Sequence, residues 1–156
     1  MLTQTLTPTV AELAPLIGTW RMDAVFPDGR QGPPEDTRAR TVFEYGPESQ
    51  FVIQRWEVPH PAAPDGIAII IADRERNALL QHYFDSRGVV RLYEMSFAAG
   101  IWTLERTKAD FSPLDFSQRW EAELTDAGGT IRGRWLDRAA DGSWSEDFAL
   151  TYTRIA

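Results

Sequence analysis

Short runs of alternating apolar and polar residues dominate the chain after Gly18, and turn residues separate them. In residues 116–124 every second position is apolar except Gln118, whereas serine, arginine and glutamate occupy the positions between. Strict alternation of this kind is typical of a β-strand with one buried face. The runs cover residues 19–26, 41–45, 51–58, 67–73, 78–85, 89–97, 101–106, 115–124, 130–137 and 144–155. About ten strands joined by tight turns predict an all-β antiparallel meander, closed as a barrel or split as a sandwich.

A short helix is predicted before the first strand, over residues 10–17. Thr9 can cap it, and Glu12 completes a capping box three residues later. Gly18 would end the helix. Because Pro15 falls within the run, we expect the helix to be short or its last turn to be irregular.

The run 89–97 has two partly apolar faces. Arg91 and Tyr93 share a face with Phe97, whereas Glu94 lies on the other. Pointing inward, Arg91 and Tyr93 would offer a cation and a phenol to a buried ligand, and a carboxylate would have to compensate the guanidinium. Pointing outward, Arg91 would cover a ring with its aliphatic stem. The sequence leaves both orientations open.

Further polar side chains are expected on the inner face of the sheet. Gln118 lies on the apolar face of its run, and Glu146 and Tyr152 share a face with Phe148. A few polar groups that converge in an apolar cavity are typical of a small-molecule site. His82 is a lone strand histidine, which more often has a structural role than a catalytic one.

The composition excludes several classes of function. The chain has no cysteine, so disulfides, thiolate nucleophiles and cysteine-ligated metals are excluded. The net charge of −7 argues against nucleic acid and against an anionic membrane surface as partners. The first 20 residues lack a basic segment followed by a long apolar run, so we expect no signal peptide and a cytoplasmic location. Six tryptophans either fill a core or line a ligand cavity.

The segment LIGTW, residues 16–20, follows the predicted helix and opens the first strand. Its Gly18-x-Trp20 pattern resembles the calycin superfamily, which includes lipocalins, fatty-acid-binding proteins and nitrobindin-like proteins. The resemblance in layout covers nearly the whole chain, although the specific motif consists of these two residues. It implies a barrel in which the tryptophan packs across one end and the interior holds a small, mostly apolar ligand.

Two ligand sets of the superfamily are not matched. Nitrobindin-like members hold haem through a histidine near the C-terminal end, and this chain has no histidine after His82. Fatty-acid-binding proteins clamp a carboxylate with Arg-x-Tyr on a late strand, whereas the order here is Tyr152-Thr153-Arg154. The resemblance therefore predicts a cavity without naming its ligand.

We expect one domain over residues 1–156, an antiparallel up-and-down barrel of about 8–10 strands with a short N-terminal helix. It would bind a small hydrophobic or amphipathic molecule. The expected ligand-binding residues are Arg91, Tyr93, Gln118, Trp120, Glu146, Tyr152 and His82. The alternative is a cofactor-free cyclase or isomerase in the same cavity, in which a buried Glu146 with a raised pKa would act as acid or base. No metal or other cofactor is expected, the expected partner is the small molecule, and a homodimer is left open.

Overall fold

The computed structural model describes residues 9–29, 31–32, 39–59, 63–110 and 116–156. These residues form strands and short 3-10 helices. The strands are β1 (Gly18–Val25), β2 (Gln31–Gly32), β3 (Arg40–Tyr45), β4 (Val52–Glu57), β5 (Gly66–Asp73), β6 (Ala78–Asp85), β7 (Val90–Ala98), β8 (Ile101–Arg106), β9 (Ser117–Thr125), β10 (Thr130–Arg138) and β11 (Trp144–Arg154). The helices are η1 (Val10–Leu16), η3 (Pro47–Ser49) and η4 (Asp126–Gly128).

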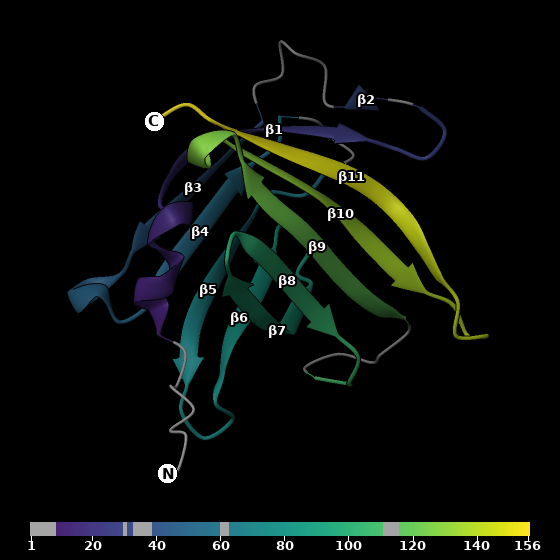
Figure 1. The fold of residues 1–156 in the computed structure, drawn as a ribbon. Helices are drawn as coiled ribbons and strands as arrows, with labels where there is room; N and C mark the ends of the chain where they lie inside the picture. The colour runs from purple at the N-terminus through teal and green to yellow at the C-terminus, as the bar shows by residue number, and fades with distance from the viewer. Residues whose placement is uncertain (1–8, 30, 33–38, 60–62, 111–115) are drawn as a thin grey trace.

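The strands form one closed antiparallel barrel (Figure 1). Consecutive strands from β3 to β11 pair with one another, and β1 pairs with both β3 and β11. In the described part of the chain this gives a ten-strand up-and-down barrel, onto which the two-residue β2 adds beside β1. Closure leaves the ten strands without a free edge. The barrel prediction is confirmed, and the sandwich alternative is wrong.

Alternation places the side chains as expected in β9. Gln118, Trp120 and Ala122 are buried, whereas Glu123 is exposed and the remaining positions are intermediate. The hairpin between β7 and β8 turns at Ala99-Gly100, where both residues have positive φ (53° and 78°). Two left-handed residues in succession match the right-handed twist of the flanking strands, and glycine adopts this conformation without strain.

The N-terminal helix η1 is a 3-10 helix, in which the amide of Ile17 donates to the carbonyl of Ala14 at 3.2 Å. Glu12 fulfils its capping role, because its Oε1 accepts from the Thr9 amide at 3.3 Å. Pro15 lies in the last turn, where it cannot donate a backbone hydrogen bond. The helix therefore stays short, as predicted, and ends at Leu16, before Gly18.

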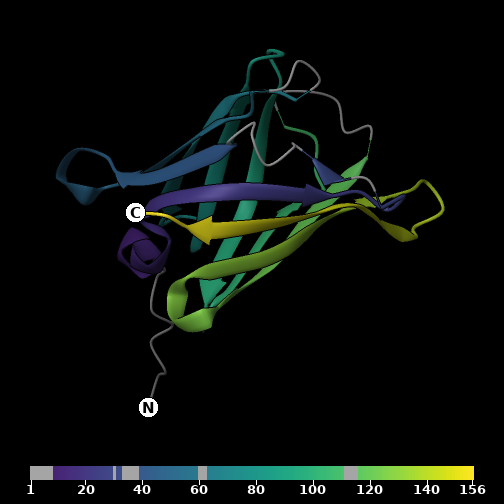
Figure 2. The same cartoon turned by 90° about the horizontal axis from the view of Figure 1, so that it is seen from above.

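Helix η1 closes one end of the barrel. Its buried residues Val10, Leu13 and Leu16 join the hydrophobic core. Trp20 at the start of β1 is fully buried there, and its Nε1 donates to the carbonyl of Leu16 at 2.9 Å. Seen from above, η1 lies at the opposite end of the molecule from the β10–β11 hairpin (Figure 2). We call these two ends the closed end and the open end.

Strands β1, β4 and β8 end at the open end. From the sequence, the irregular, proline-containing segments 29–38 and 58–66 are expected to rim a mouth of the barrel. Of these, residues 30, 33–38 and 60–62 lie outside the described residues. That expectation stays a prediction.

Candidate binding site

Aromatic rings from five strands meet in the barrel interior. The ring of Trp120 lies 5.4 Å from Trp102, 5.4 Å from Trp135 and 6.0 Å from Tyr152 between centroids. Tyr93 joins this group at 5.7 Å from Trp135. Offset and edge-to-face contacts at these distances stabilise a core beyond the area that they bury. The bulk of the interior is therefore aromatic.

A glycine makes room for this packing. A Cβ at Gly133, opposite Ala122 on β9, would lie 2.5 Å from Cη2 of Trp120. Real Cβ atoms do not approach other atoms so closely, so only glycine allows the indole to lie across β10. The position of Trp120 thus depends on a neighbouring strand.

A ladder of polar side chains crosses the other side of the interior. Gln81 Nε2 donates to Gln54 Oε1 at 3.4 Å, and Gln54 Nε2 donates to Thr41 Oγ1 at 3.2 Å. Thr41 in turn donates to the carbonyl of Arg55 at 3.1 Å. Because the Thr41 hydroxyl donates its hydrogen bond to the carbonyl of Arg55, its oxygen must accept from Gln54. All hydrogen bonds of the ladder therefore run in one direction, from Gln81 toward Arg55. Gln81 is left presenting its carbonyl oxygen.

Three interior side chains keep a polar atom without a partner among the described residues. These atoms are Oε1 of Gln81, Nε1 of Trp102 and Nε1 of Trp120. The three residues are only 4%, 2% and 1% exposed. Most buried polar atoms in folded proteins are hydrogen-bonded, so each exception calls for an explanation. Three unpartnered polar atoms in one barrel interior indicate that this interior is suited to hydrogen-bond a polar group of a ligand.

A second polar group lies toward the open end. The hydroxyl of Tyr93 donates to Oε1 of Gln118 at 2.9 Å. Asp137 lies directly opposite Gln118 on β10, so it shares the inner face. Its Oδ1 is also buried without a partner among the described residues.

A β-bulge brings a second carboxylate near Asp137. The register of β10 and β11 shifts between Trp135, which pairs with Phe148, and Leu136, which pairs with Glu146. Asp147 is the extra residue. Burial raises the pKa of Asp137, and the charge of Asp147 raises it further, whereas nearby Arg91 lowers it.

Burial also raises the pKa of the Asp147 carboxyl. Carboxylates with raised pKa values hold protons more tightly than usual. The bulge therefore places Asp147, which is exposed, beside the inward-facing Asp137 at the open end.

Arg91 lies among aromatic rings at the open end. Its guanidinium carbon is 5.9 Å from the Tyr83 ring centroid and 5.7 Å from that of Phe116. Burial raises the pKa of Tyr93, and the charge of Arg91 and its hydrogen bond to Tyr93 oppose this increase. No ion pair involving Arg91 is found among the described residues, and its side chain is half-buried. The inward orientation is therefore the one that the structure adopts.

Arg106, also at the open end, is paired. The guanidinium of Arg106 binds both oxygens of Asp110, at 2.9 and 3.0 Å, and both side chains are buried. Oδ2 of Asp110 also accepts from the Leu92 amide at 2.8 Å. This pair fastens the chain after β8 to β7.

The two interior tyrosines stay protonated at neutral pH. Burial raises the pKa of Tyr152, and a hydrogen bond from Gln54 opposes this only in part. Burial likewise raises the pKa of Tyr93. Both hydroxyls are therefore hydrogen-bond donors rather than anions.

The structure brings five of the seven predicted site residues to the inner face of the barrel. They are Arg91, Tyr93, Gln118, Trp120 and Tyr152. Their placement is consistent with a ligand site, and their binding role stays a prediction.

The expected inward orientation of Glu146 is wrong. Its side chain is exposed and contributes to an outer depression, because the bulge at Asp147 breaks the alternation that relates Glu146 to Phe148. His82 lies on the outer face as well, since its cross-strand partners are Ile69 and Leu92, whereas neighbouring Gln81 points inward.

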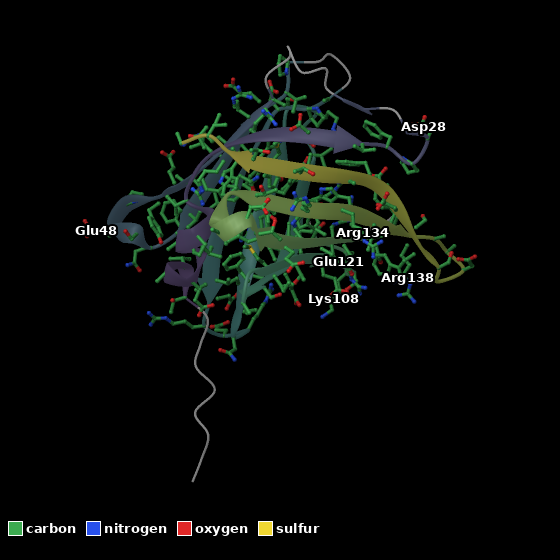
Figure 3. The ribbon with its side chains drawn as sticks, turned by 45° about the horizontal axis from the view of Figure 1, so that its top comes forward. Asp28, Glu48, Lys108, Glu121, Arg134 and Arg138 are labelled. Carbon is green, nitrogen blue, oxygen red and sulfur yellow. The ribbon has the colours of Figure 1, made fainter. Side chains whose placement is uncertain are left out.

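The outer depression lies over β8 to β11 and has a volume of about 580 Å³. Glu121 and Arg134, labelled in Figure 3, both line it and form an ion pair at 3.3 Å. Ile101 and Ala149 add apolar surface. Arg132 on its lining also pairs with Asp126, whereas no ion pair is found for Glu123 or Glu146 among the described residues.

Sequence reasoning missed the polar residues Gln54, Gln81 and Asp137. A signal was present for Gln54, which alternates with Val52 and Trp56 on the apolar face of its run. Asp137 gave no such signal, because the surroundings of a carboxylate at a strand end depend on which strand lies opposite.

In the described part of the chain, no group of three or more histidine, cysteine or acidic side chains is placed to hold a metal ion. None of the helices there has the length and apolar character needed to cross a bilayer.

No family model matches the chain, and no curated protein matches it in sequence. The crystal structure of Rv2717c from M. tuberculosis is similar, with a TM-score of 0.60 and 14% identity over 97% of this chain and 99% of that chain. At this identity the likeness shows the fold alone. It supports the antiparallel barrel that the sequence predicts.

Proposed function

We propose that the protein binds a small hydrophobic or amphipathic molecule inside the barrel, which it admits at the open end. The apolar part of the ligand contacts the aromatic rings around Trp120 and Tyr152. Its polar groups meet Arg91, Tyr93 and Gln118 nearer the open end and the unpartnered atoms of the aromatic interior.

The unpartnered buried atoms of Gln81, Trp102 and Trp120 carry this proposal. A core that serves only for packing gains nothing from a polar atom without a partner, since its desolvation costs about 1–3 kcal/mol. A ligand that supplies a hydrogen bond removes this cost on binding. Apolar walls with a few polar groups are the usual composition of small-molecule sites.

A matched pair of alanine substitutions tests the location. Ala68 is buried on the inner face opposite Gln54 and Tyr83, whereas Ala149 contributes to the outer depression. We expect Ala68→Leu to weaken binding of the neutral fluorophore N-phenyl-1-naphthylamine at least tenfold, and Ala149→Leu to leave it unchanged. Loss of binding in Ala149→Leu alone would place the site outside the barrel.

A second measurement does not depend on any variant. Native mass spectrometry of the protein purified from its own host, with an absorbance scan, would detect a retained compound. A bound small molecule supports the proposal. A compound-free protein that also fails to bind the fluorophore contradicts it.

A cofactor-free isomerase or cyclase in the same interior is the second candidate. The observation that favours it is the pair Asp137 and Asp147, whose pKa values are raised in the direction that suits proton transfer. This assignment replaces Glu146. If the retained compound is returned chemically changed, and Asp137→Asn stops the change without stopping binding, the protein is an enzyme.

A further inference from the structure

The three unpartnered atoms belong to one connected group of side chains. Gln81 donates to Gln54, which also hydrogen-bonds Tyr152. The ring of Tyr152 lies 6.0 Å from both Trp102 and Trp120. These side chains come from strands β4, β6, β8, β9 and β11, and we call the part of the aromatic interior that they line the polar point.

The donor and acceptor character of this point is defined by its contacts. The direction of the glutamine ladder leaves Gln81 with a carbonyl oxygen, which accepts hydrogen bonds. The indoles of Trp102 and Trp120 can only donate. The two rings meet edge to face, with an interplanar angle of 72°. Such a contact can direct the N–H of one ring at the face of the other, but it cannot serve both N–H groups, and it is weak.

Charge is kept away from this point. The charged residues Arg91, Arg106 and Asp137 each lie at or next to the strand terminus that faces the open end, which is the start of β7 and the end of β8 and β10. Arg154, at the closed end, donates to backbone carbonyls. An ionised ligand group beside Trp102 and Trp120 would have no counter-charge from these residues, which makes its burial costly.

We propose that this point recognises an uncharged carbonyl group with an adjoining N–H, as in a carboxamide or lactam. This inference rests on the proposed function. The ligand oxygen accepts from the indole N–H groups of Trp102 and Trp120. The ligand N–H donates to Oε1 of Gln81. The ligand is thus inserted with this group in the interior and its remaining surface toward the open end.

Three neutral compounds of nearly equal shape test the proposal by isothermal titration calorimetry. The compound 2-naphthamide offers both an acceptor and a donor, 2-acetonaphthone offers only the acceptor, and 2-ethylnaphthalene offers neither. We expect affinity to fall about tenfold at each step, because each step leaves a buried polar group unsatisfied.

Variants assign the two steps to atoms. Gln81→Leu should abolish the preference for 2-naphthamide over 2-acetonaphthone. Trp102→Phe or Trp120→Phe should reduce the preference for 2-acetonaphthone over 2-ethylnaphthalene. Trp144→Phe is the matched control, because Trp144 lies against Arg119 at 4.5 Å on the outer face and should leave all ratios unchanged.

The readout is a ratio of affinities within one protein, so a general loss of stability in a variant does not imitate the expected result. Equal affinity of the wild-type protein for all three compounds would overturn this inference and leave the proposed function standing. Preferences that persist in Gln81→Leu and in both tryptophan variants would also overturn it. If none of the three binds, both the inference and the proposed function fail.

Discussion

Two arginines stack on aromatic rings at opposite ends of the barrel. At the closed end, the guanidinium carbon of Arg154 lies 4.1 Å from the Trp20 ring centroid. Its nitrogens donate to the carbonyls of Pro15, Ile17 and Gly128 at 2.5, 2.7 and 3.1 Å. Three elements that are distant in sequence are thereby joined by one side chain.

Arg91 at the open end has a looser environment. It lies 5.9 and 5.7 Å from the rings of Tyr83 and Phe116, and no ion pair is found for it in the described ranges. The closed-end arginine uses its donors on backbone carbonyls, whereas Arg91 hydrogen-bonds Tyr93. We propose that the remaining donors of Arg91 meet a ligand.

The largest expected effect is that of Arg154→Ala. The change removes charge-assisted hydrogen bonds to three carbonyls and exposes the face of Trp20, so we expect a loss of about 3 kcal/mol in the free energy of unfolding. Denaturant unfolding monitored by tryptophan fluorescence measures it. Arg132→Ala is the control, since Arg132 is exposed and pairs weakly with Asp126 at 3.4 Å. Equal losses of unfolding free energy in Arg154→Ala and Arg132→Ala would show that Arg154 has no special structural role at the closed end.

The second effect is a pH dependence confined to the open end. The Asp85 carboxylate is fully buried and accepts from the Tyr83 hydroxyl at 2.7 Å and from Arg87 Nη2 at 2.7 Å. Burial alone would raise its pKa, but hydrogen bonds from Arg87 and Tyr83 lower it from 3.8 to about 2. A lowered pKa means that the folded state favours the carboxylate, so this stability is complete above pH 4 and is lost as the pH falls toward 2.

We expect the Asp85 contribution to be about 1–2 kcal/mol. Its measurement is the difference in unfolding free energy between pH 6 and pH 2.5 for the wild-type protein and Asp85→Asn. The variant should lose less stability on acidification than the wild type. Asp126→Asn, at an exposed position of the closed end, should match the wild type. The carbonyl partners of Arg154 do not titrate, so the closed end should not add to this dependence.

The fold was predictable because its signals are local. The alternation around Gln118 and Trp120 identifies a half-buried strand, and Gly18 and Trp20 mark the entry into the barrel. Closure of the barrel could not be derived from alternation, which a sandwich would show equally. The pairing of Trp20 with Arg154 links positions at the two ends of the chain.

The candidate site was less predictable, since it depends on register. One extra residue in β11, Asp147, moves Glu146 to the outer surface. No pattern within 144–155 reveals this, because the bulge is defined by where the partner strand shifts between Trp135 and Leu136. A site built across strands requires the strand order before any residue can be assigned to it.

The smallest expected effect on stability is that of Arg91→Ala, which should lower the unfolding free energy by less than about 1 kcal/mol, because a partly exposed cation over two rings contributes little. Binding should respond more strongly. The proposed use of its free donors predicts that affinity for dodecanoate falls about tenfold, since a charge-assisted hydrogen bond is lost, while affinity for the uncharged dodecanol stays the same. Calorimetry with both ligands separates charge recognition from apolar contact, and Arg132→Ala again controls for the change in net charge. If Arg91→Ala instead unfolded the protein as readily as Arg154→Ala, or weakened both ligands alike, Arg91 would be a structural residue, and the two ends of the barrel would differ in position alone.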